Sequence, residues 1–249
     1  MSNVKNEIES HNHSKEVLDL LLEFDSFMDS LTVIADLGAG SGLDINWFAK
    51  LMTRDDPPMP HDYECYAVDI NISRLVNLPE NVTVIQKDFE EKLDLPSTID
   101  LLWCHDAFQY ATNPLRTLKL WNEQMSVNGM LALSFPQSSG YRYNRLVNRA
   151  HDGCYYNHNV CNLIYMLAVN GFDCKDLYMK KDTNSPWLYL VVYKTDIAPM
   201  DPKTTRWTDL ADKGLLHESI VKSLNKHGHV RQEDIIMLWL NKDWTFCKD

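Results

Sequence analysis

The glycine-rich segment at residues 36–42 limits the folds available to this chain more than any other feature. It reads Asp-Leu-Gly-Ala-Gly-Ser-Gly and follows an apolar, β-branched run at residues 31–37, which predicts a buried strand. Trp47, Phe48 and Leu51 then predict a helix. Glycines between a strand and a helix let the backbone approach a ligand and adopt positive φ, and the first N–H groups of the helix attract a carboxylate or phosphate. Gly-rich turns also serve plain packing, so this turn by itself leaves both interpretations open.

Strand-like and helix-like segments alternate along the rest of the chain. Further strands are predicted at residues 65–68, 82–86, 99–104 and 130–135. A helix starts at Asn113-Pro114 and is expected to end at Asn128-Gly129, and another covers residues 160–169. Residues 173–179 and 187–193 are strands close enough to pair antiparallel. This alternation predicts an α/β fold with a doubly wound, mostly parallel sheet, which binds ligands beyond the carboxyl ends of its strands.

Both ends of the chain carry additional segments. Ser14 is expected to cap an N-terminal helix at about residues 14–28, within a domain that covers residues 1–195. Residues 196–249 are predicted to be a linker and a small helical extension, with helices at 218–226 and 232–240. Two short helices cannot bury themselves alone, so they are expected to pack on the sheet domain or on a second subunit, which would form a homodimer.

Composition narrows the partners and the compartment. The net charge is −11, with 24 Lys+Arg against 35 Asp+Glu, and this balance disfavours bulk binding to nucleic acid. The apolar runs are too short to span a bilayer, and no signal peptide is visible, so no membrane contact is expected. Six cysteines occur without a Cys-x-x-Cys pair. Reduced cysteines and a cytoplasmic location are therefore expected.

Acidic residues follow the next two predicted strands. Asp69 ends the second strand, where a carboxylate can accept hydrogen bonds from two ribose hydroxyls. Asp88 and Phe89 follow the third strand and offer an acceptor and an apolar wall to an adenine. Because the carboxyl ends of parallel strands meet at one edge of the sheet, these features favour a nucleotide-like ligand there.

Four segments in order resemble the motifs of class I S-adenosylmethionine-dependent methyltransferases. They read VIADLGAGSG, YAVDIN, VIQKDFE and IDLLWCHDAFQYATNPLRTLKLWNEQMSVNGMLALSFP. The resemblance is closest to the small-molecule branch of the quinone-biosynthesis type. It covers residues 31–136 well and 156–194 loosely, and it implies a seven-stranded Rossmann-like sheet whose last strand is antiparallel. It also implies S-adenosylmethionine as cofactor and S-adenosylhomocysteine as product.

The resemblance implies roles for particular residues. Asp36, Gly38, Ala39 and Gly40 would hold the methionine end of the cofactor. Asp69 would bind the ribose, while Ile70 and Phe89 would flank the adenine and Asp88 would meet its amino group. Cys104 and His105 would line the methyl region.

The chemistry implied is in-line displacement of the methyl group onto an O or N atom of a small molecule. Alignment is the main requirement, and it is worth roughly 7–11 kcal/mol of barrier. A base is needed only if the acceptor arrives protonated. His105 is the first candidate, with Asp106, His151 and His158 as others. The branch often carries Glu-His where this chain has Gln109-Tyr110, so a base borrowed from that histidine is unsupported.

An aromatic and basic stretch follows the fifth predicted strand. Tyr141, Arg142, Tyr155, Tyr156 and His158 are the candidate residues that contact the acceptor. An amphipathic surface segment explains the same composition equally well.

Other kinds of protein share parts of this pattern. His151, Cys154, His158 and Cys161 are zinc-ligand types, but on one helix they would spread over about 15 Å, so no metal is expected. A nicotinamide dehydrogenase is disfavoured because Leu43 stands where its fingerprint has a third glycine. A catalytically silent cofactor-binding or scaffold protein of the same fold, and a methyltransferase acting on a macromolecule, stay open.

Overall fold

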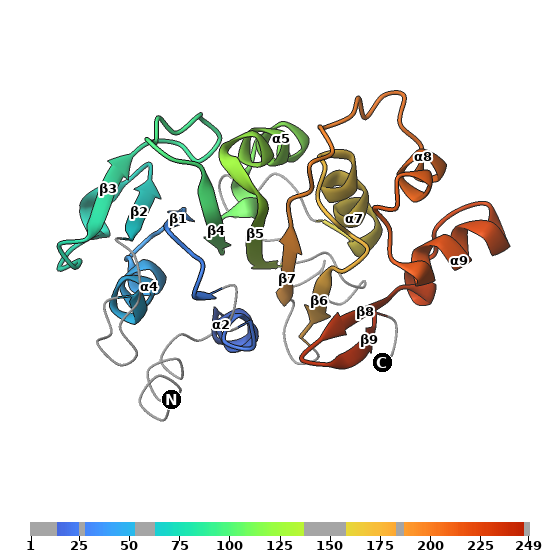
Figure 1. Cartoon of the computed structure of the whole chain (residues 1–249), viewed down its shortest axis with the longest axis horizontal. Coiled ribbons are helices and arrows are strands. Elements are labelled where there is room, and N and C mark those ends of the chain that lie inside the picture. The colour runs from blue at the N-terminus through green and yellow to red at the C-terminus, as the bar shows by residue number, and fades with distance from the viewer. Residues whose placement is uncertain (1–13, 25–27, 53–62, 137–157, 183–186, 247–249) are drawn as a thin grey trace, which may run out of the picture.

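The computed structural model describes residues 14–24, 28–52, 63–136, 158–182 and 187–246. These residues form one mixed sheet of nine strands, with helices on both faces (Figure 1). The strands are β1 (Val33–Leu37), β2 (Glu64–Asp69), β3 (Val82–Gln86), β4 (Ile99–His105), β5 (Met125–Pro136), β6 (Tyr178–Lys181), β7 (Trp187–Tyr193), β8 (Ile236–Trp239) and β9 (Lys242–Thr245). Their order across the sheet is β3-β2-β1-β4-β5-β7-β6-β8-β9.

Two apolar layers cover the sheet. One face carries α2 (Lys15–Leu21) and α4 (Leu43–Met52), whose buried side chains include Leu18 and Phe48. On the other face lie α5 (Pro114–Gln124), α7 (Val160–Val169), α8 (Trp207–Asp212) and α9 (Glu218–His227). Short 3₁₀ turns are η2 (Ile72–Arg74), η3 (Phe108–Tyr110) and η4 (Gln232–Asp234). Among the described residues, no helix is both long enough and apolar enough to span a membrane.

The central strands run parallel, as the alternation of strands and helices predicts. Strand β1 pairs in parallel with both β2 and β4, and parallel pairing continues outward to β3 and β5. Strand β7 pairs antiparallel with β5 and β6, which confirms the predicted hairpin of 173–193 while shortening its first strand to Tyr178–Lys181. The strand order reverses between β1 and β4, so the turns after these strands meet at the position where such sheets bind ligands.

The prediction of seven strands was wrong, because two further strands extend the sheet. Residues 232–240, predicted as a helix, form η4 and β8, and β8 pairs in parallel with β6. Ile235, Met237 and Trp239 are buried in alternation, which is the period of a strand. A short apolar run fits a strand or a buried helix equally well. Here the residues form a strand, because β8 pairs antiparallel with β9 in a hairpin.

The C-terminal extension is therefore part helix and part sheet. The helix predicted at 218–226 is present as α9 and ends at Gly228 with φ 74°. Buried side chains of the extension share one apolar cluster with the strands and with α7; they include Leu210, Leu216, Ile220, Met237 and Phe246. The extension thus packs on the sheet rather than projecting from it.

Helix α5 ends earlier than Asn128-Gly129 suggests. It stops at Gln124, and β5 begins at Met125. Asn128 takes the left-handed conformation (φ 64°) inside the strand, and the pairing of β4 with β5 shifts register between Ile99 and Leu101. The Asn-Gly pair therefore marks an irregularity within a strand and not a helix end.

Ser14 precedes α2 but does not cap it. Its hydroxyl instead donates to the carboxylate of Asp44 at the start of α4, at 2.9 Å. Helix α2 ends at Leu21, shorter than the predicted 14–28. Lys180 of β6 binds Glu16 of this helix at 2.7 Å, so the N-terminal helix is tied to the far half of the sheet.

Candidate functional site

A cavity of about 690 Å³ lies at the carboxyl ends of β1, β2, β3 and β4. Its volume is in the range of about 300–1,000 Å³ that small-molecule sites occupy. The walls come from four turns and from the starts of α2 and α4: Ser14, Asp36, Gly38, Ala39, Gly40, Ser41, Leu43, Asp44, Asp69, Ile70, Arg74, Asp88, Phe89, Glu90, His105, Asp106, Ala107, Tyr110 and Thr112.

The glycine turn is seated against the neighbouring turns. Gly38 has φ +76°, and its N–H donates to the carbonyl of Val68 at 2.8 Å. A Cβ on Gly38 would lie 2.4 Å from the Cβ of Ala107, much closer than two carbon atoms tolerate. The backbone after β1 thus approaches the turn after β4 closely enough to exclude any side chain.

Asp69 joins the ends of β1 and β2. One carboxylate oxygen accepts the N–H of Gly40 at 2.8 Å, and the other accepts the N–H of Asn71 at 2.8 Å. Ile70 follows with its apolar side chain largely exposed at the cavity wall. The carboxylate is therefore held in a fixed orientation and keeps lone pairs for a ligand.

Two further carboxylates stand behind the glycine turn. Asp36 is buried, and that burial, reinforced by the negative charges of Asp44 and Asp69, raises the pKa of its carboxyl well above the ordinary value. Asp44 accepts the hydroxyl of Ser14 and, at 3.0 Å, the indole N–H of Trp103. A positive charge in the cavity would favour the ionised form of Asp36, because opposite charges stabilise one another at low dielectric.

Glu90 connects the turn after β3 to the start of α5. Its carboxylate accepts the N–H and hydroxyl of Thr112, the N–H of Asn113 and the hydroxyl of Thr117, at 2.7–3.1 Å. Burial alone would raise the pKa of Glu90, but these hydrogen bonds outweigh it and lower the pKa below the ordinary value. This cluster holds one wall of the cavity rigid.

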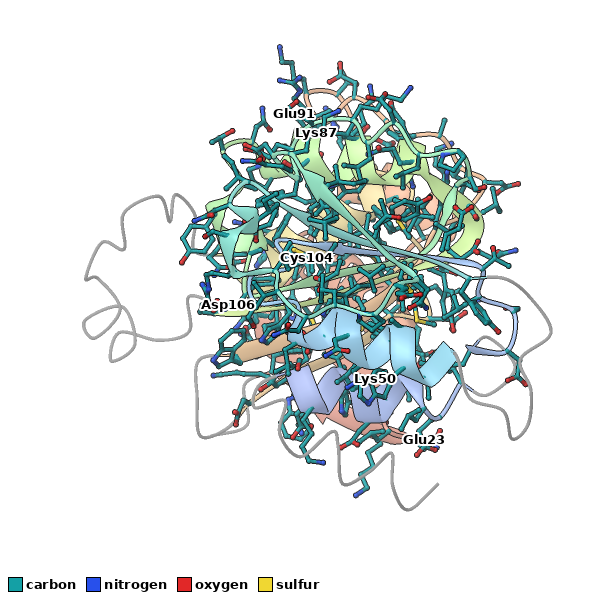
Figure 2. All side chains as sticks on the ribbon, turned by 90° about the vertical axis from the view of Figure 1, so that its left-hand side faces the viewer. Glu23, Lys50, Lys87, Glu91, Cys104 and Asp106 are labelled. Atoms are coloured by element: carbon teal, nitrogen blue, oxygen red, sulfur yellow. The ribbon has the colours of Figure 1, made fainter. Side chains whose placement is uncertain are left out.

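His105 ends β4 at the cavity wall. Its ring stacks on Trp187 of β7, with centroids 5.2 Å apart and planes 13° apart, and its Nδ1 contacts the hydroxyl of Ser134 on β5. Cys104 points the other way: it is fully buried, and burial together with Asp36 raises the pKa of its thiol. Figure 2 shows Cys104 in the middle of the sheet and Asp106 toward one end.

Nearly all residues to which the sequence motifs give a cofactor role line this one cavity. They are Asp36, Gly38, Ala39, Gly40, Asp69, Ile70, Asp88, Phe89 and His105. Cys104 does not line it, since it belongs to the apolar core. Tyr141, Arg142, Tyr155, Tyr156, His151 and Cys154 lie outside the described residues.

His158 does not line this cavity. It stacks on Phe108 with ring centroids 5.2 Å apart, it contacts Phe135 edge-on, and burial lowers its pKa to about 4. A second, smaller cavity of about 310 Å³ lies beside it, between the start of α5 and α7. A histidine so buried in aromatic surroundings is neutral at physiological pH.

Several lining residues carry no motif that sequence reasoning could use. Asp44 stands two residues after the last glycine of the turn, and its acidity at the start of a helix is a common stabilising feature. Ser14 reaches the cavity from the N-terminal helix, a placement that only the packing of α2 creates. Glu90 directly follows a motif residue, so it could have been proposed from its position in the sequence, as Asp106 was when it was named a candidate base.

No family model matches the sequence, and no curated protein matches it. Solved structures do. One from Listeria monocytogenes, described as an S-adenosylmethionine-dependent methyltransferase, is 16% identical, with a TM-score of 0.51 over 68% of this chain and 93% of the other. Magnesium protoporphyrin IX methyltransferase from Synechocystis, with bound S-adenosylhomocysteine, is also 16% identical, with a TM-score of 0.54 over 76% and 86%. This chain has a methyltransferase fold.

Human N-acetylserotonin methyltransferase, solved with S-adenosylmethionine, adds a third comparison at 16% identity. Its TM-score is 0.53 over 71% of this chain, which spans 50% of the human enzyme. At such identities the similarity concerns the fold. The cavity at the carboxyl ends of β1 to β4 is the candidate site within this fold.

Proposed function

We propose that this chain binds S-adenosylmethionine in the 690 Å³ cavity and transfers its methyl group to an O or N atom of a small molecule. One observation carries the proposal: the glycine turn, Asp69 and the Asp88-Phe89 pair, identified as motifs in the sequence, converge on a single cavity. The fold supports it, since two solved structures that share the fold are described with S-adenosylmethionine or S-adenosylhomocysteine bound.

The lining fits the charges of this cofactor. Its methionine end carries an ammonium, a carboxylate and a sulfonium. Asp36 is buried at the cavity wall without an ion pair to a lysine or arginine among the described residues. A cationic group there would therefore offset the free-energy cost of burying its carboxylate. The N–H groups of Gly38, Ala39, Gly40 and Gly42 already donate to groups of the chain. The first turn of α4 lies at the cavity wall, and a helix N-terminus favours a carboxylate.

The adenosine end fits the opposite part of the cavity. Asp69 is oriented by Gly40 and Asn71 to accept from ribose hydroxyls. Ile70 and Phe89 offer apolar surface on which an adenine ring would bury area, and Asp88 offers an acceptor for its amino group. These assignments are the ones that the sequence motifs imply.

The bound cofactor supplies an activated methyl group on sulfur. The chain then has to orient the acceptor, exclude water and take up a proton where the acceptor carries one. We assign the proton to the imidazole of His105, whose ring is oriented by Trp187 and by the contact of Nδ1 with Ser134. Tyr110 also lines the cavity wall, and Trp187 packs against the ring of His105.

The test is transfer of a labelled methyl group from S-adenosylmethionine to a panel of phenols, catechols, carboxylic acids and amines. We expect transfer to at least one class, lowered about 10²-fold in His105→Gln, the typical size of a general-base contribution. Tight cofactor binding without transfer to any compound would instead favour the catalytically silent cofactor-binding protein of the same fold.

A further inference from the structure

The cavity wall is strongly acidic. Six of its residues are carboxylic acids, against one arginine and one histidine: Asp36, Asp44, Asp69, Asp88, Glu90 and Asp106, with Arg74 and His105. A concave site with one sign of charge concentrates ligands of the opposite sign and repels those of the same sign. The described part of this wall therefore disfavours an acceptor that carries a carboxylate or phosphate.

Most of these carboxylates already have partners within the chain. Asp69 accepts two backbone N–H groups, and Asp88 accepts the N–H of Glu90 at 2.9 Å. Glu90 accepts four hydrogen bonds from α5 and the residues before it. Asp44 accepts from two side chains. With Asp36, Asp69 and Asp88 assigned to the cofactor, and Asp44 and Glu90 bonded within the chain, one acidic side chain stays available for the acceptor.

That side chain is Asp106, which the fold holds in an unusual conformation. Its φ is 52°, in the left-handed region that residues other than glycine rarely adopt. Its N–H donates to the carbonyl of Ser134 at 2.8 Å. The amide of Gln109 donates to both its carbonyl and its Oδ1, the latter at 2.6 Å. Its Oδ2 accepts no hydrogen bond from any described residue.

The amide of Gln109 holds Asp106 in place. Its side chain is 3% exposed, and its Oε1 is buried without a hydrogen-bond partner among the described residues. An unpaired buried acceptor lowers stability, so Gln109 makes its hydrogen bonds to Asp106 at a cost to the fold. A buried unpaired group beside a ligand cavity points to a side chain that is held in place for function.

Asp106 also lies next to the reacting end of the site. The next residue, Ala107, packs against Gly38 of the glycine turn, and the preceding residue, His105, is the assigned base. Figure 2 shows Asp106 toward the end of the sheet, beyond Cys104. The carboxylate, the imidazole and the glycine turn therefore share one end of the cavity.

We propose that the methyl acceptor is an amine, bound as its cation by Asp106, and that Gln109 is the positioning residue for this carboxylate. The inference rests on the proposed function. The bound ammonium first loses one proton to His105. Its nitrogen lone pair then forms the bond to the methyl carbon as the carbon–sulfur bond breaks, and that electron pair stays on sulfur. The products are a neutral thioether and a methylated ammonium, so charge and atoms balance.

An acceptor-independent probe tests the charge preference. Sinefungin carries a protonated amine where S-adenosylmethionine carries its methyl sulfonium, and S-adenosylhomocysteine carries a neutral sulfur there. Calorimetric dissociation constants for both compounds give a ratio that does not depend on the fraction of protein that is folded. We expect wild-type protein to bind sinefungin at least about 10-fold more tightly than S-adenosylhomocysteine, the equivalent of one charge-assisted hydrogen bond.

Variants locate the source of that ratio. Asp106→Asn should lower it about 5- to 10-fold and leave the S-adenosylhomocysteine constant within about twofold. Gln109→Leu should lower it in the same direction, because the carboxylate loses its orientation, while a purely structural role would leave the ratio unchanged. Asp94→Asn is the matched control, since its side chain is 84% exposed and lies outside the cavity wall.

Three results would overturn the inference. The ratio could be near one in wild-type protein, it could be unchanged in Asp106→Asn, or labelled methyl groups could reach phenols or carboxylic acids but no amine. Failure of both compounds to bind would have a different meaning, since it would remove the proposed function itself.

Discussion

The carboxylate of Asp69 accepts the backbone N–H of Gly40 at 2.8 Å, and so links the end of β2 to the glycine turn that follows β1. Its other oxygen accepts the N–H of Asn71. The same side chain therefore joins two walls of the cavity, and it is the one proposed to bind the ribose. Both the packing of the two turns and the binding of the cofactor are expected to depend on this carboxylate.

Two substitutions of Asp69 remove different numbers of its hydrogen bonds. Asp69→Asn keeps one carbonyl oxygen for a hydrogen bond, whereas Asp69→Ala keeps none. We expect the dissociation constant for S-adenosylhomocysteine to rise about 10-fold in the first variant and about 100-fold in the second, from one and two lost charge-assisted hydrogen bonds. Asp176→Asn, at an exposed position, is the control. Wild-type affinity in both Asp69 variants would exclude this residue from the site.

Gly38→Ala tests the close approach of the two turns. The new Cβ would lie 2.4 Å from that of Ala107 at a φ of +76°, so strain and overlap add to about 2–4 kcal/mol of destabilisation. Gly214→Ala is a matched control, because Gly214 has φ +70° and nothing lies within 4 Å of its Cβ position. That variant should lose only about 1 kcal/mol. Equal losses in urea unfolding would show that the overlap with Ala107 is relieved without cost.

Glu90 should make stability depend on acid. Its pKa is lowered in the folded chain, so its contribution is complete above the ordinary value of 4.5 and is lost as pH falls through the lowered pKa. Glu90→Gln should reduce the free energy of unfolding by about 1–3 kcal/mol at pH 7. The difference from wild type should shrink below about pH 4.5. A difference that stays constant between pH 7 and pH 3 would contradict the hydrogen-bond network as its source.

The C-terminal hairpin should contribute to the main core. Met237 is fully buried in β8, within the cluster that includes α7 and the central strands. Met237→Ala should cost about 2–5 kcal/mol of unfolding free energy. Val127→Ala, at a position that is 53% exposed, should cost less than about 0.5 kcal/mol. Similar small effects of both substitutions would mean that the extension unfolds separately from the sheet.

The sequence allowed most of the central fold to be predicted, because the hydrophobic periodicity and the turn and cap residues there indicate the same elements. The strand before Gly38, the turn and α4 follow from the apolar run and three glycines, and α7 and α9 end at residues suited to that position. Residues 232–240 failed because an unbroken apolar run carries no period. Part of this segment forms strand β8 because it pairs with the edge of β6.

The site was predictable to the extent that its residues belong to motifs. Asp36 and Asp69 lie at the ends of β1 and β2, Asp88 follows β3, and the three converge, as expected of a parallel sheet. Cys104 differs because it alternates with His105 along β4, and side chains on successive strand residues face opposite sides. Ser14 reaches the cavity through tertiary packing, and no local pattern marks it. Asp106 was a candidate base from the sequence, but its left-handed backbone and its hydrogen bond from the amide of Gln109 became visible only in the fold.

The most direct measurement is calorimetric titration of the wild-type chain with S-adenosylmethionine and S-adenosylhomocysteine, with Gly38→Ala as the matched variant. The account predicts one site per chain with a dissociation constant of about 1–100 µM, and at least about tenfold weaker binding when Gly38 is replaced. If neither compound binds to protein that is folded by circular dichroism, the cavity is not a site for this cofactor, and the proposed methyl transfer is wrong.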